Sequence, residues 1–395
     1  MLRTSSPRSA RRRGTDSGTR DSGFGIRDSG FGIRDSANDD TSRESSVALN
    51  RVLPVVSLLL LLAPLRAAMR VEVLTSVGGL PPEIVGVYRE AAVFQQVSSG
   101  QYLVFDRRAH AVFGVDAGRT TTWKLVEIGE EAGRVLDPMA FDSEPGGSFV
   151  VADAPGGRER VQVFSPGGRQ LGGFSLPGRS APRITLDNIV LSGIGSLQYT
   201  GSSLLMSQPE TGALMTEYGL GGTPTRSIGA LRPTGHEADA ALHLALNAGL
   251  PLVNPRGGFY YVFQAGIPMF RKYDREGQLV FERHIEGIEL DRSVAAIPTL
   301  WPRRPGGGRE KDLPLVAPMV RSAAVDTQGN LWIALVQPYT YVYDSDGNKS
   351  RVVQFRGAGV IAPSSLFFTA SGRLLVAPGC YEFAARPAGP RAPAS

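Results

Sequence analysis

The stretch from Ala140 to Gly168 reads AFDSEPGGSFVVADAPGGRERVQVFSPGG and holds the pattern on which the whole chain is built. A polar turn that ends in glycine leads into a short apolar strand, and a second apolar strand and a second glycine turn follow. Short strands rich in Val and Phe, separated by Gly, Asp, Ser and Pro, are typical of antiparallel meanders. The stretch therefore predicts part of a small antiparallel sheet.

The first turn of this pattern, with its strand, occurs six times along the chain. The copies are SSGQYLVFD (Ser98–Asp106), PGGSFVVAD (Pro145–Asp153), YTGSSLLMS (Tyr199–Ser207), RGGFYYVFQ (Arg256–Gln264), TQGNLWIAL (Thr327–Leu335) and ASGRLLVAP (Ala370–Pro378). Their turn glycines are separated by 47, 54, 57, 71 and 43 residues. Such repetition indicates a repeat architecture, because one unit cannot bury its apolar face without neighbours.

Further apolar stretches complete each unit on both sides of this pattern. QLVFERHIEG (Gln278–Gly287) follows the second turn of its unit, and RSAAVD (Arg321–Asp326) precedes the first turn of the next. Each unit thus has four short strands, the number found in one blade of a β-propeller. The sequence predicts an all-β fold, a six-bladed β-propeller of four-stranded antiparallel blades.

The two ends of the propeller are expected to meet in one blade. The sixth unit provides three strands, the last being YEFAA (Tyr381–Ala385), and then becomes rich in Pro and Ala. The stretch MRVEVLTSVGG (Met69–Gly79) has the apolar alternation of a strand. We expect Arg70–Ser76 to pair with Tyr381–Ala385, because this closes the ring and removes two exposed sheet edges. The propeller then spans residues 69–387, and residues 388–395 form a disordered tail.

The repeated units resemble those of the NHL-repeat family and its six-bladed bacterial relatives. Ala140–Gly168 matches the family pattern closely, and AAVDTQGNLWIALVQPYTYVYDSDG (Ala323–Gly347) matches most of it. The resemblance covers roughly residues 69–385. It implies a six-bladed propeller that binds proteins or ligands on one face, and since one scaffold carries many functions it names no particular activity.

The segment before the propeller has two parts. Residues 1–46 are Ser, Arg, Gly and Asp with few aliphatic side chains, so we expect a disordered low-complexity extension. Residues 47–68 contain Arg51, the apolar run Val52–Leu65 and a small-residue exit, the pattern of a secretory signal peptide or an N-terminal anchor. We interpret Met1 as a misassigned start; a cytoplasmic tail on an uncleaved anchor, or a true low-complexity segment, are the alternatives. The expected location is periplasmic or secreted, with membrane attachment only through residues 52–65.

Most of the net positive charge of the chain comes from its first 68 residues. The whole chain has 42 Lys plus Arg and 37 Asp plus Glu, and residues 1–68 contain 11 and 7 of them, leaving 31 and 30. A nearly neutral propeller lacks the basic excess that nucleic acid requires, so we expect no nucleic-acid partner. We expect the domain to be monomeric.

Two stretches interrupt the repeat, and both link the outermost strand of one blade to the innermost strand of the next. They are Arg232–Gly249 and Ile288–Pro318. Equivalent links emerge on the same face of a propeller, so the insertions should lie side by side as a partial rim. Long loops on a rigid scaffold are where binding residues concentrate.

The candidate ligand-binding residues of this rim are Trp301, Arg303, Arg304, His236 and Arg321. Trp and Arg are favoured at binding hot spots, and arginine pairs suit carboxylates or phosphates. The alternative is an ordinary polar loop with Trp301 packed against a blade. His236, Asp239 and His243 share one face of a short predicted helix, but nearly two turns separate the histidines, so we expect no metal.

The sequence favours a binding function over catalysis. The chain has four histidines, and no GxSxG, HExxH or P-loop motif occurs. Near the predicted inner strands it offers Gln95, Asn188, Asn254 and Arg321, and the strand-ending aspartates, Asp142 among them, suit structural turns. We predict a non-catalytic module, without cofactor or catalytic residue, for a protein, peptide or glycan. A metal-dependent propeller enzyme, a lactonase-like hydrolase or a lyase, is the alternative.

Overall fold

The computed structural model describes residues 69–176, 182–186, 189–192, 196–305 and 312–385. The predicted extension, signal segment and tail at residues 1–68 and 388–395 lie outside the described residues. In the described part, no helix is long and apolar enough to cross a membrane.

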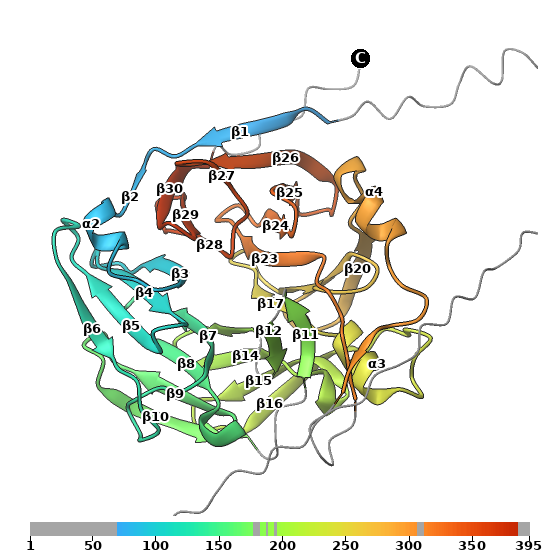
Figure 1. The fold of residues 1–395 in the computed structure, drawn as a ribbon, viewed down its shortest axis with the longest axis horizontal. Coiled ribbons are helices and arrows are strands. Elements are labelled where there is room, and N and C mark those ends of the chain that lie inside the picture. Colours follow the sequence, from blue (N-terminus) through green and yellow to red (C-terminus); the bar gives the residue numbers. More distant parts are fainter. Residues whose placement is uncertain (1–68, 177–181, 187–188, 193–195, 306–311, 386–395) are drawn as a thin grey trace, which may run out of the picture. The chain divides into compact units, whose positions relative to one another are not determined.

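The chain forms a six-bladed β-propeller of four-stranded antiparallel blades, which confirms the predicted fold class (Figure 1). From the channel outward, the first three blades are β3 (Ala91–Gln96), β4 (Tyr102–Asp106), β5 (Ala111–Val115) and β6 (Thr122–Val126); β7 (Pro138–Ser143), β8 (Phe149–Asp153), β9 (Arg160–Phe164) and β10 (Gln170–Ser175); and β13 (Leu197–Tyr199), β14 (Ser203–Ser207), β15 (Ala213–Gly219) and β16 (Pro224–Ala230).

The fourth blade is β17 (Gly249–Val253), β18 (Phe259–Phe263), β19 (Met269–Tyr273) and β20 (Leu279–His284). The fifth is β23 (Val320–Val325), β24 (Leu331–Leu335), β25 (Thr340–Tyr343) and β26 (Lys349–Arg356), and β27 (Val360–Ile361) also pairs with β26. The sixth is β28 (Ser365–Phe368), β29 (Arg373–Ala377), β30 (Tyr381–Ala384) and β2 (Gly78–Gly79).

The apolar core lies between neighbouring blades. Phe105 of the first blade stacks on Phe141 of the second at 5.4 Å between ring centroids, and Phe149 and Phe164, both of the second blade, extend the same cluster. The second and third blades join in the same way through Val150, Val161 and residues of β14. Each unit therefore buries its apolar face only because the next unit covers it.

An N-terminal strand closes the ring as predicted, but it is β2 and not the longer stretch before it. Gly78 and Gly79 pair with Glu382 and Tyr381 of β30. The predicted pairing of Arg70–Ser76 with Tyr381–Ala385 is wrong, because β1 (Val71–Thr75) pairs in parallel with β26 of the fifth blade. Without β1 the outer edge of the eight-residue β26 would be unpaired. It pairs with all five residues of β1, whereas β30 has only four residues.

Substitutions in β1 should show which of its faces stabilises the fold. Leu74 is buried against the core between the fifth and sixth blades, whereas its neighbour Val73 is 48% exposed. We expect Leu74→Ala to lower the free energy of unfolding by about 2 kcal/mol and Val73→Ala by less than about 0.5 kcal/mol. Chemical denaturation measures both. Equal effects would mean that β1 does not pack on the propeller in solution.

The links between blades and the glycine turns emerge on opposite faces, because strands alternate in direction within a blade. We call the face with the blade-to-blade links the insertion face and the other the turn face. The insertion face also carries the loops between second and third strands, including the short helices η2 (Pro155–Gly157) and η3 (Pro209–Thr211). The link that enters the first blade contains α2 (Pro82–Val85).

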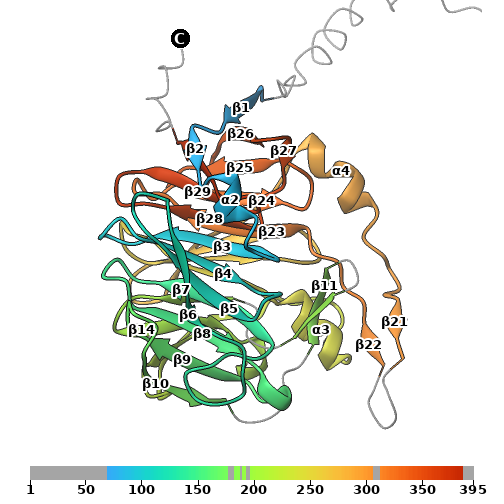
Figure 2. The ribbon, with the colours of Figure 1, turned by 60° about the vertical axis from the view of Figure 1, so that its left-hand side comes forward.

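Three insertions, not two, lie on the insertion face. The predicted pair contains α3 (Ala240–Leu246) in one link, and α4 (Ile288–Ala295), β21 (Arg303–Arg304) and β22 (Leu313–Pro314) in the next. The third, in the link from the second to the third blade, is the hairpin of β11 (Pro182–Leu186) and β12 (Ile189–Ser192). α3 contacts both β11 and β22, so the insertions form one group, as Figure 2 shows.

Candidate functional site

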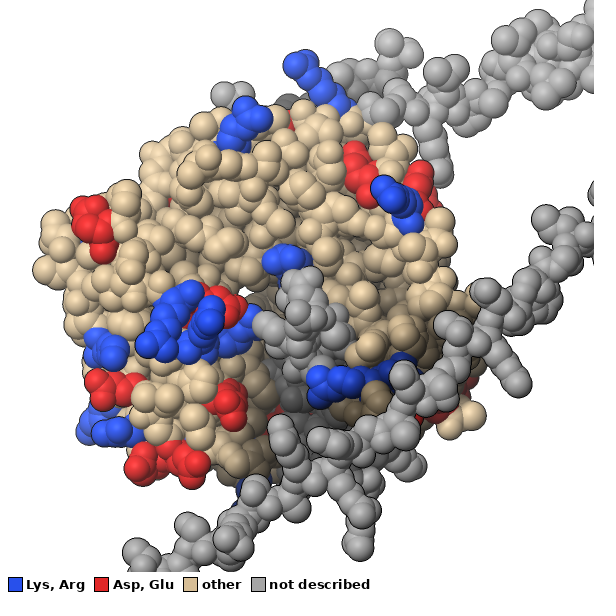
Figure 3. Space-filling model, viewed as in Figure 1, with Lys and Arg blue, Asp and Glu red and all other residues tan. Residues whose placement is uncertain are grey.

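The central channel widens on the insertion face into a cavity of about 870 Å³, which we call the insertion-face cavity. Inner strands of all six blades line it, together with loops of the first, second and fourth blades. Figure 3 shows the hollow at the centre of this face, with basic and acidic side chains beside it. The lining side chains that can carry charge are Glu90, Arg107, His110, Asp137, Asp142 and Arg321.

A ring of side chains forms the waist between this cavity and a smaller one, of about 610 Å³, on the turn face. Each inner strand contributes one residue to both cavities: Gln95, Asp142, Gln198, Leu252, Ala323 and Leu366. The waist is polar on the first three blades and apolar on the other three. The two halves of the channel therefore offer different contacts to anything inside.

Asp142 joins three blades at this waist. Its carboxylate accepts hydrogen bonds from Gln95 Nε2 at 2.8 Å and from the backbone N–H of Tyr199 at 2.7 Å, and Gln95 Oε1 accepts one from Ser143 Oγ at 2.6 Å. Burial raises the pKa of Asp142 to about 6, because the loss of hydration outweighs these hydrogen bonds. The sequence placed Asp142 among the turn aspartates; it lies instead within β7 and faces the channel.

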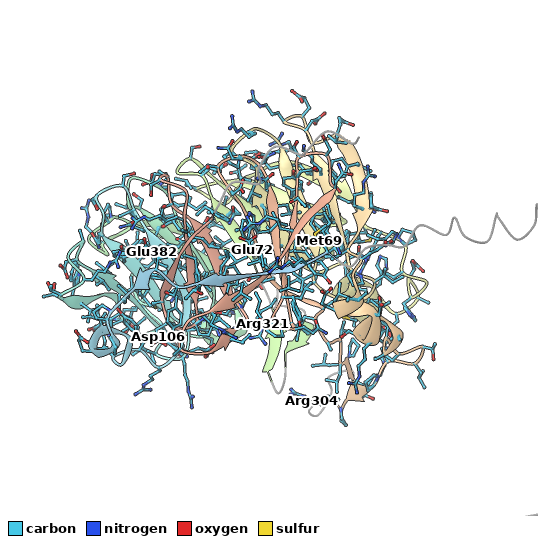
Figure 4. The ribbon with its side chains drawn as sticks, turned by 90° about the horizontal axis from the view of Figure 1, so that it is seen from above. Met69, Glu72, Asp106, Arg304, Arg321 and Glu382 are labelled. Atoms are coloured by element: carbon cyan, nitrogen blue, oxygen red, sulfur yellow. The ribbon has the colours of Figure 1, made fainter. Side chains whose placement is uncertain are left out.

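Arg321 enters the insertion-face cavity from a β-bulge. The register of β23 shifts between Val320 and Ser322, and the inner strands of the first two blades shift at the same position, leaving Ala92 and Met139 as the extra residues. Bulges re-aim a side chain, and all three of these line the cavity. Arg321 is the charged one of the three. Figure 4 shows it on the side of the molecule that carries Arg304.

Several polar groups of this cavity have no partner among the residues that the structure describes. Arg321 Nε, His110 Nδ1 and Ser365 Oγ are buried without a hydrogen bond, and an unpaired buried polar atom costs about 1–3 kcal/mol. Glu90 and Arg107, by contrast, form an ion pair with each other. The cavity thus contains donors and acceptors that the protein itself leaves unused.

Two cavity residues also have left-handed backbone conformations. His110 and Asp137 both have φ near 51°, and Asp137 is exposed at the mouth of the cavity. Left-handed residues other than glycine cost about 1–3 kcal/mol each and gather at functional sites. Among the described residues, the carboxylate of Asp137 makes no hydrogen bond or ion pair.

The predicted rim residues lie together on the insertion face, but most of them hold the insertions in place. Trp301 packs against the cluster of Leu242, Ala245, Leu246, Ala248, Ala265 and Val316, most of which belongs to the insertions and not to a blade. Arg303 forms an ion pair with Asp239 and donates to Asp312 O at 3.0 Å. Arg304 is exposed, and His236 is partly buried beside Thr234. Arg321 stands apart from them, in the channel.

Arg232, the residue that fixes the first insertion, was not predicted as a functional residue from the sequence. Its buried guanidinium donates to the carbonyl oxygens of Leu246, Ala265 and Ile267 at 2.6 to 2.8 Å and lies over the ring of Phe263. Burial lowers the pKa of Arg232 to about 10. These bonds hold the end of α3 against the fourth blade, next to Gln264, which lines the cavity.

The inner-strand candidates divide between the two faces. Gln95 and Arg321 line the insertion-face cavity. Asn254 follows β17 on the turn face, where its Oδ1 accepts from the backbone N–H of Arg256 at 3.0 Å. Asn188 lies outside the described residues. Within the described ranges, no three His, Cys, Asp or Glu side chains come together as a metal site.

No protein-family model and no curated protein matches this chain. Among solved structures it is similar to a streptogramin B lyase, with 11% identity, a TM-score of 0.45 and 73% of this chain and 76% of that chain covered. Virginiamycin B lyase from Staphylococcus aureus has 10% identity, a TM-score of 0.42 and coverage of 72% and 75%. Hydrazine synthase from Kuenenia stuttgartiensis has 12% identity, a TM-score of 0.42 and coverage of 73% and 93%.

These likenesses are loose and concern the arrangement of strands alone. The six-bladed propeller that the resemblance to NHL repeats implies is confirmed by the strand pairing, whereas membership of that family is not shown.

Proposed function

We propose that this chain is a periplasmic or secreted binding module that takes a small polar ligand, or the polar end of a peptide or glycan, into the insertion-face cavity. The observation that carries the proposal is the guanidinium of Arg321, which a β-bulge directs into a cavity of about 870 Å³ and which has no protein partner among the described residues. Cavities of roughly 300–1,000 Å³ are typical of small-molecule sites.

The cavity is a better candidate than the rim, because of how the two groups of side chains are used. On the rim, Trp301 is packed and Arg303 is paired with Asp239. In the cavity, Arg321, His110 and Ser365 have buried polar atoms that no described residue binds, so these atoms are available to a ligand.

Thermal unfolding with a panel of compounds tests this proposal. The panel contains amino acids and short peptides, neutral and acidic sugars, and nucleotides. A ligand at 100 times its Kd should raise the free energy of unfolding by about 2.7 kcal/mol, and Arg321→Gln should remove most of that gain. Replacing residues 305–311 with a short Gly-Ser link, which keeps Arg303 and Asp312, should leave both stability and binding almost unchanged.

The outcomes separate the alternatives. The bound compound should be recovered unchanged after long incubation, and its conversion to product would contradict a non-catalytic role. Binding that survives Arg321→Gln but is lost in the variant with the short link would move the site to the rim. If no compound class stabilises the protein, the proposal fails.

A further inference from the structure

We propose that the ligand of the insertion-face cavity is a zwitterion, a free amino acid or a short peptide, whose carboxylate binds Arg321 and whose ammonium group faces Asp137. This inference rests on the proposed function and adds the chemical class of the ligand. Its basis is that Arg321 and Asp137, two charged cavity residues without an ion pair among the described residues, stand on opposite sides of the ring.

Arg321 and Asp137 lie on opposite sides of the ring because of the order of the blades. Arg321 belongs to the inner strand of the fifth blade, and Asp137 directly precedes the inner strand of the second. In a ring of six, the second and fifth blades face each other across the channel. Arg321 and Met139 hold equivalent bulge positions, so Asp137 lies two residues nearer the mouth, a rise of roughly 6–7 Å along the strand.

Ion pairs neutralise some of the other charges around the cavity but not these two. Glu90 pairs with Arg107, and the buried carboxylate of Asp153 pairs with Arg160. In the described part of the chain, Arg321 and Asp137 have no ion pair with each other or with any other side chain. The cavity is therefore dipolar, with a positive side on the fifth blade and a negative side on the second.

A dipolar cavity selects by repulsion as well as by attraction. Asp137 repels a purely anionic ligand, and Arg321 repels a purely cationic one. A neutral ligand leaves both charges without a partner. A molecule with a carboxylate at one end and an ammonium group at the other satisfies both, and guanidinium–carboxylate contacts are among the stronger hydrogen-bonded pairs.

The space between the two charges suits a peptide backbone. Gln198 and Gln264 line the cavity, and their side-chain amides have no hydrogen-bond partner among the described residues. An amide offers both a donor and an acceptor, which complement the N–H and C=O of a peptide bond. Leu250 and Leu252 provide apolar contact for side chains.

Calorimetric titration of the full-length protein with alanine peptides tests the inference. The probes are alanine and its oligomers up to five residues, each with free ends, with the amine acetylated, with the carboxyl amidated, and with both ends blocked. We expect one length to bind best, because it matches the span from Arg321 to Asp137. Blocking either end of that peptide should weaken binding roughly tenfold to a hundredfold.

Two variants assign each end of the peptide to a side chain. In Arg321→Gln the free and amidated peptides should bind equally, and in Asp137→Asn the free and acetylated peptides should bind equally. Asparagine tolerates the left-handed backbone of residue 137, so this variant should keep the fold. Arg169→Gln and Asp346→Asn, exposed charges of the turn face, are the matched controls and should bind as the parent does.

Equal binding of free and doubly blocked peptides would overturn the inference. So would a ligand of another class, such as an acidic sugar, that binds with dependence on Arg321 while every peptide fails. That result would leave the proposed function intact. Failure of all ligand classes in the thermal panel would instead remove the proposed function itself.

Discussion

Replacing Glu382 with alanine is expected to lower the free energy of unfolding by about 2–3 kcal/mol, because this carboxylate joins the sixth blade to the first. Glu382 is buried in β30 and accepts hydrogen bonds from Arg119 at 2.7 Å and Arg373 at 2.6 Å. Arg119, from the first blade, also donates to Gly79 O of the closing strand at 3.0 Å. Both guanidiniums are partly exposed, which reduces the cost below that of a fully buried pair.

Chemical denaturation of matched variants measures this effect. Glu217→Ala removes a more exposed ion pair, with Arg226, inside the third blade and should cost less than about 1 kcal/mol. Glu382→Gln keeps one acceptor oxygen, so its loss of stability should lie between those of Glu382→Ala and Glu217→Ala. If Glu382→Ala costs no more than Glu217→Ala, the carboxylate does not hold the ring closed.

The closing strand also shows why sequence alone named the wrong stretch. Gly79 has φ of 144°, and a Cβ atom built there would lie 2.3 Å from the carbonyl oxygen of Cys380. A glycine therefore fits beside β30 where an apolar strand residue does not. The alternation of Met69–Gly79 correctly predicted a strand, but alternation does not say which sheet edge the strand meets.

The six blades could be predicted because the same glycine turn recurs in every unit. The turn glycine of every unit has a positive φ, which few other residues adopt: Gly100, Gly147, Gly201, Gly258, Gly329 and Gly372. The third insertion, with β11 and β12, was missed although the step of 54 residues from Gly147 to Gly201 exceeds the shortest steps of 43 and 47. That excess was the available signal.

The cavity residues could be predicted only in part. Arg321 was predicted from the sequence as a binding residue. Its position in the cavity depends on a register shift in β23, which no residue pattern predicts. Asp137 became visible only through its left-handed backbone and its place across the ring from Arg321. Contacts between blades depend on how the six inner strands align, and a single sequence does not contain that alignment.

Replacing Asp142 with asparagine is expected to stabilise the protein at pH 7 by about 2 kcal/mol. The pKa of Asp142 is about 6 in the folded protein, above its ordinary value of 3.8 when unfolded. Between these two values the folded protein holds a proton that the unfolded chain has lost. Stability contributed by this group is therefore complete below pH 4 and is lost as the pH rises through 6, by up to about 3 kcal/mol.

Asparagine reproduces the neutral acid at every pH. Its oxygen can accept from the backbone N–H of Tyr199, and a flipped amide of Gln95 can accept from its nitrogen while donating to Ser143 Oγ. Unfolding measured from pH 4 to 7.5 should show that the two proteins are equally stable near pH 4 and that Asp142→Asn is the more stable above pH 6. The exposed Asp346→Asn is the control and should follow the parent throughout.

The opposite result would change the electrostatics of the channel. If Asp142→Asn is less stable than the parent at pH 7, the hydrogen bonds from Gln95 and Tyr199 outweigh the cost of burying the carboxylate. The carboxylate of Asp142, on the same inner strand that follows Asp137, would then carry its negative charge well below pH 6 as well as above it. The cavity would then be equally dipolar from about pH 4 to 7.5, so the preference for a ligand with an ammonium group facing the second blade should not change over this range.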